Sequence, residues 1–517
     1  MSFLARLRAD REPLAITLEK HKGIRRLIED FYPDNAHFIY ELLQNSEDAG
    51  ATEVKFELLS DKLVFEHNGR RSFTEKDVES ITDIGESSKQ ADTEAIGKFG
   101  VGFKSVFVYT ESPVVYSKTF SFRITRLVLP EAVAPFPNLD GRTRFEFPFN
   151  SSKKSPAVAH AEVQEGLRQL ADTTLLFLTN LRCISWSFSG QTGEVLRERH
   201  SEVHIEILKA APDGKSSSSH WLRFDRPVEG LERQTVAVAY ELAFVGERNA
   251  FESGTALAKQ MKIVPAERGR VAVFFPADKE ESGLRFHLHA PFIPELSRAS
   301  IKDSPVNEPL FRQLGHLAAS SLHWLKAEGL LTGEFLAVLP SSEDPVRKNY
   351  QVVRQAIIKE MQEQALTPTH SRQHAPANRL LQARAVLKDL LSDADLAFLH
   401  GSNVGLTWSI SPNQRGSKQE KFLSSLDIRD WDADEFIEHV AHAATPGNSW
   451  SYGGADLRFM NWLRSKPDEW HQQFYAVMYR ALIDEDDFKL LEEAQIVRKA
   501  DGSYCILALA GVPLLQE

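Results

Sequence analysis

The spacing of apolar and polar residues predicts both helices and strands in the first part of the chain. The stretch DNAHFIYELLQNSEDAGA places apolar residues three and four apart, which predicts an amphipathic helix. Asp34 at its beginning and Gly50 at its end are typical helix start and stop residues. The next stretch, TEVKFELLSDKLVFEHNG, has two β-rich runs around Ser60 and Asp61, which predicts a hairpin.

The same region continues with mixed patterns. DVESITDI predicts a short helix, and RTRFEFPF predicts a further strand. Between them ESSKQADTEA, residues 86–95, is polar and has no apolar face, so we expect a mobile loop there. Together these patterns predict an α/β domain over residues 1–154.

Two more regions follow. Residues 155–335 begin with a helical stretch, AEVQEGLRQLADT, continue with strand-like stretches such as VAVAYEL, and end on another helical stretch; we expect a middle α/β domain. From residue 336 to 517 the patterns are mainly helical, which predicts a helical C-terminal region. A chain of 517 residues has room for about three domains at roughly 100–200 residues each.

Composition narrows the class of protein. Apolar residues make up 42% and charged residues 26%, as in ordinary soluble globular proteins. The sequence has no apolar run of about 18 residues and no secretion signal at its start, so we expect a cytoplasmic protein without a membrane span. The two cysteines, Cys183 and Cys505, form neither a disulfide framework nor a thiolate metal site. A net charge of −11 disfavours sequence-blind nucleic-acid binding, although a local basic patch would still allow direct contact.

A stripe of polar residues on the first predicted helix has side chains suited to binding a metal ion and to accepting a proton. Glu41, Asn45 and Asp48 occupy positions i, i+4 and i+7, beside the apolar face that contains Leu42. An amide oxygen is a hard, neutral ligand for Mg²⁺, which also binds phosphate oxygens. A carboxylate can orient and deprotonate a water molecule. Taken alone, the stripe also fits the solvated side of an ordinary helix.

The stretch IGKFGVGFKSVF, residues 96–107, concentrates three glycines in six residues. Glycines allow backbone N–H groups to converge on a phosphate. Gly97 and Gly102 have P-loop spacing, but Phe103 stands where the P-loop lysine belongs, so the pattern is not a P-loop. The dinucleotide-binding pattern fails as well, because a serine replaces its third glycine. The spacing alone fits a simple glycine-rich turn equally well.

The order of these features carries a family resemblance. The Glu/Asn helix is followed by a strand ending in HNG, a polar loop, the glycine stretch and the strand TRFEFPF. This arrangement resembles the ATP-binding domain of the GHKL superfamily, which includes heat-shock chaperones, MutL, gyrase B subunits and histidine kinases. HFIYELLQNSEDAGA most resembles sacsin-like and NO VEIN-like proteins. The resemblance is specific over residues 20–150 and implies a two-layer α/β sandwich that binds ATP and Mg²⁺.

The resemblance also implies a role for individual residues. Glu41 matches the general base and Asn45 the Mg²⁺ ligand. The implied nucleotide-binding residues are those of the helix, the HNG motif, the lid loop, the glycine cradle and the last strand of the domain: Asn45, Asp48, His67, Asn68, Gly69, Lys89, Gly97, Lys98, Phe99, Gly100, Val101, Gly102, Phe103 and Thr143. The polar loop of residues 86–95 matches the ATP lid of the family, and Lys89 in it matches a lid residue that reaches phosphate. Thr143 matches a threonine that helps to hold adenine.

Two positions depart from the family pattern. One is Arg142, which precedes Thr143 where the family usually has glycine. His67 stands where GHKL proteins have the aspartate that binds the adenine amino group. A neutral imidazole accepts one hydrogen bond and carries no fixed charge. We therefore expect weaker adenine selectivity than in the family, or selectivity that another residue supplies.

The middle region contains further candidates. In GHKL ATPases with a middle domain, a basic residue from that domain reaches the γ-phosphate, and Arg298 and Lys302 lie in a suitable loop-like stretch. We favour Arg298, because a guanidinium binds phosphate through two hydrogen bonds; either residue is also compatible with an ordinary solvated charge. His287 and His289 share one strand face, but no third metal ligand lies near them in sequence, so packed strand residues are the favoured interpretation.

Three functions remain open. The first is a slow, Mg²⁺-dependent ATPase that acts as a sacsin-like or chaperone-like conformational clamp, with a homodimer or another protein as partner. The second is an ATP-gated module of an antiviral defence or nucleic-acid-processing system that works with a nuclease or effector. The third is a scaffold that binds nucleotide without turnover. We favour the first, because the net acidity argues mildly against direct DNA binding.

Overall fold

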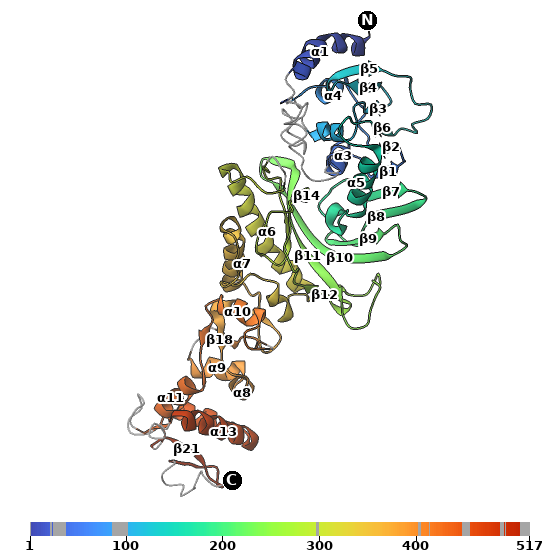
Figure 1. Ribbon diagram of the computed structural model, residues 1–517. Helices are drawn as coiled ribbons and strands as arrows, with labels where there is room; N and C mark the ends of the chain where they lie inside the picture. The colour runs from blue at the N-terminus through green and yellow to red at the C-terminus, as the bar shows by residue number, and fades with distance from the viewer. Residues whose placement is uncertain are drawn as a thin grey trace. The chain divides into compact units, whose positions relative to one another are not determined.

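The computed structural model describes residues 2–20, 23, 38–84, 102–295, 299–401, 405–412, 414–446, 455–485, 491 and 493–506. The chain divides into two compact units (Figure 1). Unit 1 comprises Met1–Trp324, Val338–Pro340 and Asp344–Ala356, and unit 2 comprises Leu325–Ala337, Ser341–Glu343 and Ile357–Glu517.

One mixed sheet of 15 described strands runs through unit 1, in the order β14-β13-β15-β11-β10-β9-β8-β7-β1-β2-β6-β3-β4-β5, with β12 beside β11. The strands are β1 Glu53–Leu58, β2 Lys62–His67, β3 Val114–Tyr116, β4 Ser121–Thr125, β5 Leu129–Ala132, β6 Thr143–Pro148, β7 Cys183–Phe188, β8 Gln191–Arg199, β9 His204–Ala210, β10 Ser216–Val228, β11 Leu231–Phe244, β12 Met261–Val264, β13 Val271–Val273, β14 Phe275–Pro276 and β15 His287–His289.

The predicted hairpin is confirmed as β1 and β2, which pair antiparallel with Leu58 opposite Leu63. Alternation in β1 sends Val54, Phe56 and Leu58 into the core. Its two exposed positions, on the other face of the strand, are charged. One face of this hairpin is therefore available for helices to cover, which is the basis of the α/β layering.

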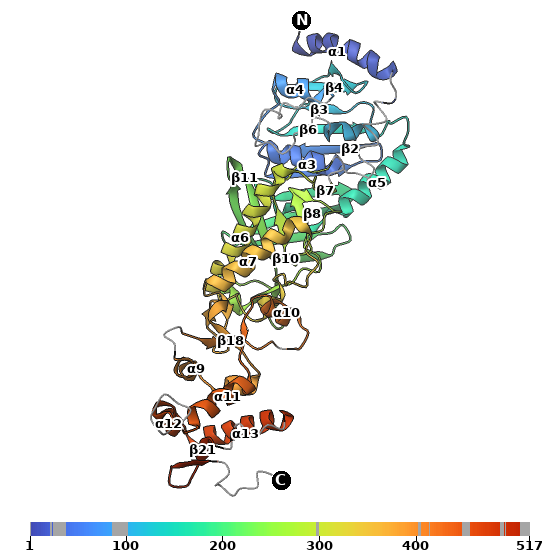
Figure 2. The ribbon, with the colours of Figure 1, turned by 90° about the vertical axis from the view of Figure 1, so that its left-hand side faces the viewer.

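Helices pack on this sheet, as the expected α/β class requires (Figure 2). They are α1 Phe3–Lys20, α3 Phe38–Asp48, α4 Glu75–Ile81, α5 Pro156–Arg168, α6 Glu308–Ala327 and the 3₁₀ helix η1 Gly102–Val108. The ring of Phe38 on α3 lies 6.1 Å from that of Phe147 on β6. On α6, the Ser321 hydroxyl is 3.0 Å from the Tyr240 hydroxyl of β11.

The predicted boundary at 154/155 does not separate compact units. Strand β1 of the first predicted domain pairs in parallel with β7 of the second, with Glu53 opposite Cys183. The predicted boundary near 335/336 lies close to the division between the two units. The division into three domains stays a prediction, and the structure joins the first two domains through one continuous sheet.

Unit 2 is mainly helical, as expected. Helices α6 and α7 both cross the division between the units. The described helices from α7 onward are α7 Gln351–Glu363, α8 Ala385–Leu390, α9 Asp393–Leu399, α10 Lys418–Ser424, α11 Ala433–Ala444, α12 Leu457–Arg464 and α13 Asp468–Glu485. The short strands of unit 2 are β16 Thr367–Pro368, β17 His374–Ala375, β18 Leu380–Gln382, β19 Thr407–Trp408, β20 Arg429–Asp430, β21 Gln495–Arg498 and β22 Tyr504–Ile506. Across the described part of the chain, every helix is too short or too polar to cross a membrane.

Candidate functional site

Helix α3 places Glu41 against the glycine-rich stretch. Phe38, Leu42 and Leu43 are buried on the core side of the helix, and Glu41 is itself only 4% exposed. A Cβ atom added to Gly102 would lie 2.7 Å from Cδ of Glu41 and closer still to its Oε2. A side chain at position 102 would therefore force the buried Glu41 carboxylate or the η1 backbone to move. The predicted base and the end of the predicted phosphate cradle are in contact.

The other end of α3 meets the HNG motif. Gly50 ends the helix with a positive φ of 68°, as its stop signal predicted. A Cβ atom on Gly69 would lie 2.8 Å from both Cβ of Ala49 and Nδ1 of His67. The helix contacts η1 through Glu41, and the turn that follows the helix contacts the HNG motif through Ala49. Gly69 and Gly102 lie more than thirty residues apart along the chain.

Strand β6 brings Thr143, another predicted site residue, to the region of the HNG motif. Thr143 pairs with His67 across β2 and β6, and both side chains are buried. The ring of Phe103 lies 6.1 Å from that of Phe145 and 6.3 Å from that of Phe147. In the first predicted domain, α3, the end of β2, η1 and β6 therefore lie close together.

His67 is a neutral hydrogen-bond donor in this setting. Burial lowers the pKa of His67 to about 4, so the imidazole carries no charge at neutral pH. Its Nδ1 accepts a hydrogen bond from the Gly69 N–H at 3.1 Å. In the neutral ring the hydrogen must then be on Nε2, which leaves a donor where an aspartate would offer only acceptors.

Asn68 and Lys104 have structural partners. The Asn68 Oδ1 accepts hydrogen bonds from the N–H groups of Thr52 and Glu53 at 2.9 and 3.0 Å, which fixes the start of β1. Lys104 is 1% exposed, and its Nζ donates to the carbonyl oxygens of Ile81 and Leu127 at 2.8 and 2.7 Å. Burial lowers the pKa of Lys104 to about 7. Lys104, which follows Phe103 in the glycine-rich stretch, therefore anchors η1 to α4 instead of facing solvent.

Glu47 is the site-positioning residue that the sequence interpretation missed. Its carboxylate accepts three backbone hydrogen bonds, from Thr179, Asn180 and Leu181, at 2.7, 2.7 and 2.8 Å. It is 4% exposed. These contacts hold α3 against the segment 175–181, which lies well outside the first predicted domain. No sequence signal links Glu47 to residues more than 130 positions away.

The same segment is held from its other side by two buried arginines. Arg197 on β8 donates to the carbonyl oxygens of Leu175, Leu178 and Thr179. Arg223 on β10 also donates to the Leu178 carbonyl, at 3.1 Å. Residues 175–181 thus connect α3 directly to the strands of the second predicted domain.

Replacing Glu47 by alanine is expected to destabilise unit 1. Three backbone donors, the buried N–H of Leu181 and the part-buried N–H groups of Thr179 and Asn180, would lose a charged acceptor. Each such bond contributes about 1.5–3 kcal/mol, so we expect a loss of at least roughly 3 kcal/mol. Denaturant unfolding of Glu47→Ala measures this loss in the free energy of unfolding. The control is Glu79→Ala, which replaces an exposed helical glutamate. A loss within about 0.5 kcal/mol of the control, the range of ordinary surface substitutions, would contradict this role.

Several predicted site residues lie outside the described residues: Lys89, Gly97, Lys98, Phe99, Gly100, Val101 and Arg298. The predicted lid, residues 86–95, lies outside them too. Among the described candidates, Asn45 and Asp48 are half-buried on α3, and the side chain of Lys302 is exposed. Their roles stay predictions.

Comparison with known proteins supports the expected resemblance. Residues 63–125, which include the HNG motif and η1, match the family described as "Sacsin domain". Protein NO VEIN of Arabidopsis thaliana is 26% identical over 330 residues, covering 58% of this chain and 12% of its own length. Human sacsin is 30% identical over 213 residues, covering 30% of this chain and 5% of its own length.

A solved structure, the B-subunit of the DNA gyrase from Myxococcus xanthus, aligns with 67% of this chain and 99% of its own, at 11% identity and a TM-score of 0.36. The predicted resemblance to sacsin-like and NO VEIN-like proteins is confirmed by the sequence matches. Because this chain spans only a small part of both curated relatives, their activities as whole proteins are not assigned to it.

Proposed function

We propose that unit 1 of this sacsin-like chain binds Mg²⁺-ATP where α3, Gly69, Gly102 and Thr143 meet, and hydrolyses it slowly. The observation that carries the proposal is the contact between Glu41 and Gly102, where an added Cβ atom would overlap the Glu41 carboxylate. This contact places a buried carboxylate at the end of a glycine stretch that could receive a phosphate.

The residues present fit a magnesium ion in their donor chemistry. Asn45 is half-buried one turn from Glu41, and its amide oxygen is the kind of hard ligand that Mg²⁺ binds. When bound, the ion would neutralise charge on the phosphates. The role we assign to Glu41 is to orient a water molecule and accept its proton, and backbone N–H groups at Gly102 and Phe103 would bind phosphate oxygens.

The proposed binding is tested by calorimetric titration of the full chain with ATP, with and without Mg²⁺. We expect saturable binding that Mg²⁺ strengthens, and a loss of the Mg²⁺ effect in Asn45→Ala, since that variant removes only the proposed ligand. Asn461→Ala, a change on helix α12 of unit 2, is the matched control. Absence of binding at millimolar ATP in the presence of Mg²⁺ would overturn the proposal.

The hydrolytic cycle is proposed to act as a conformational clamp. Glu47 fixes α3 to residues 175–181, and Arg197 and Arg223 fix these to the sheet, so a shift of α3 would be passed to strands β8 and β10. A basic residue from the second predicted domain, with Arg298 preferred over Lys302, would bind the γ-phosphate. A contact made with ATP and not with ADP supplies the difference in affinity that a switch needs. A second copy of the chain or another protein would be the partner of the closed state.

Base selectivity is expected to be modest, because His67 offers a donor where adenine's amino group needs an acceptor. In competition binding, GTP should displace labelled ATP at comparable concentration, and His67→Asp should shift the preference toward ATP. If wild type already rejects GTP by about 10³-fold, worth roughly 4 kcal/mol, another residue distinguishes the bases.

A further inference from the structure

Three side chains of types that bind metals in proteins cluster at the end of β8 and on β9 and β10. His200 directly follows β8, Glu206 is on β9 and His220 is on β10. Glu206 and His220 are cross-strand partners, so their side chains share one face of the sheet. The turn after β8 brings His200 to the same face, since its N–H donates to the His204 carbonyl at 3.0 Å.

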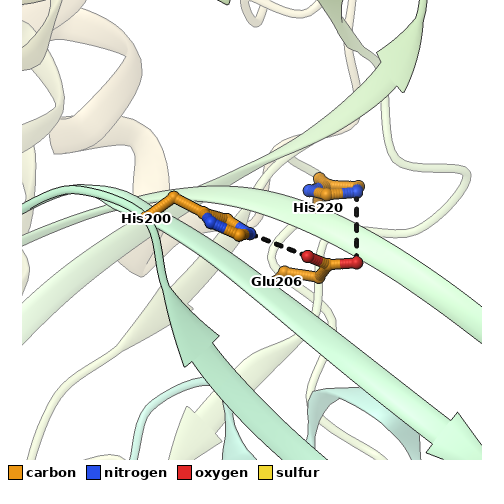
Figure 3. A group of neighbouring side chains, drawn as sticks. All are labelled: His200, Glu206 and His220. Atoms are coloured by element: carbon orange, nitrogen blue, oxygen red, sulfur yellow. Dashed lines mark hydrogen bonds and ion pairs between the residues drawn. The ribbon is translucent and has the colours of Figure 1, made fainter. Parts of the chain in front are cut away.

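The potential ligand atoms converge on one point. Nε2 of His200 lies 2.7 Å from Oε2 of Glu206, and Nε2 of His220 lies 3.6 Å from Oε1 of the same carboxylate (Figure 3). All three residues offer ligand atoms within 4.8 Å of one another. Tetrahedral Zn²⁺ with bonds of about 2.1 Å holds its ligands roughly 3.4 Å apart, so small side-chain rotations suffice.

Neighbouring side chains provide the outer contacts that a metal site requires. Nε2 of His204 lies 3.1 Å from Nδ1 of His220. When Nδ1–H of His220 donates to His204, the Nε2 lone pair of His220 faces the cluster, which is the tautomer that binds a metal. Ser218 donates to Glu206 Oε1 at 2.6 Å and fixes the carboxylate. Orienting partners of this kind are typical of metal ligands.

The surroundings also suit a bound ion. The ring of Phe251 covers one side, 4.5 Å from the ring of His200 and 4.7 Å from that of His204. The side chain of His220 is 4% exposed, whereas that of His200 is 21% exposed. The site is therefore shielded on its inner side and open to solvent at His200, which gives an ion a way in.

We propose that His200, Glu206 and His220 bind one divalent transition-metal ion of the Zn²⁺ type, which ties the turn after β8 to β9 and β10. Two imidazoles and one carboxylate are a ligand set that zinc uses, and they leave a fourth position for water. Imidazole ligands favour such ions over Mg²⁺ or Ca²⁺. The proposal is independent of nucleotide binding, because it uses none of the residues of that site.

The test uses the full chain stripped of metal with a chelator and then dialysed. Calorimetric titration with Zn²⁺ should show one saturable site per chain, and Zn²⁺ should raise the melting temperature. Glu206→Gln, which preserves side-chain size and should leave the fold intact, and His220→Ala should each weaken binding by at least about 100-fold, since even outer-contact residues cost 10–100-fold.

His316→Ala, an exposed histidine on α6, is the matched control and should bind Zn²⁺ like wild type. Cobalt offers a second readout, because a tetrahedral Co²⁺ complex gives visible absorption bands that Glu206→Gln should lose. Two results would overturn the proposal: no saturable Zn²⁺ binding at micromolar concentration in wild type, or equal affinity in Glu206→Gln and wild type.

Discussion

Replacing Glu41 by alanine is expected to reduce ATP turnover about 10²–10⁴-fold, the usual contribution of a general base, while the nucleotide still binds. The Glu41 carboxylate is buried against Gly102, at the end of the proposed phosphate-binding stretch. We propose that this carboxylate contacts the attacking water and not the nucleotide, so its loss should affect turnover and not binding. Steady-state phosphate release and calorimetric ATP binding, measured on the same preparations, separate the two effects.

Glu79→Ala is the matched control for this experiment, because it removes an exposed glutamate from a different helix, α4. Its turnover should equal that of wild type. Equal turnover in Glu41→Ala and wild type would assign the base to another residue. Loss of ATP binding together with turnover would show instead that Glu41 supports the structure of the site.

Replacing Gly102 by alanine is expected to disturb the same contact from the other side. The new methyl group would overlap the Glu41 carboxylate, so either the side chain or the η1 backbone must move. Overpacking of this kind costs about 1–3 kcal/mol of folding stability, and the displaced base should lower turnover by about 10²-fold or more. Gly405→Ala is the control, because a Cβ there has no atom within 4 Å.

A double-mutant cycle shows whether the loss of stability in Gly102→Ala comes from the clash with Glu41. If the methyl group acts through Glu41, then Gly102→Ala should destabilise the Glu41→Ala protein much less than it destabilises wild type, since the clashing carboxylate is gone. Denaturant unfolding of the four proteins measures this coupling. An equal loss of stability in both backgrounds would place the strain in the η1 backbone and remove Glu41 from the explanation.

Elements with local signals could be predicted from the sequence. The helix with Glu41, the hairpin of β1 and β2 and the stop at Gly50 are confirmed, because periodicity and turn residues act over a few positions. The parallel pairing of β1 with β7 joins strands about 130 residues apart, and no local pattern encodes it. The role of Glu47 depends on that pairing. In the sequence alone, Glu47 is therefore indistinguishable from any other polar residue of a helix.

Sites built from histidines are also hard to predict when they depend on long-range strand pairing. His287 and His289 attract attention because they are two residues apart, yet each ring accepts a backbone N–H bond through Nδ1, from Arg270 and Phe274. The favoured interpretation as packed strand residues is confirmed by their burial. The cluster of His200, Glu206 and His220 depends on the register between β9 and β10, which becomes visible only in the folded sheet.

The most direct test of the account is hydrogen exchange of the full chain with and without Mg²⁺ and a non-hydrolysable ATP analogue. We predict that the analogue slows exchange in peptides from α3 (38–48), η1 (102–108) and β6 (143–148), with little change in α11 (433–444) of unit 2. Unchanged exchange in those three segments at saturating analogue, or protection confined to other parts of the chain, would contradict the claim that the nucleotide binds at Glu41 and Gly102.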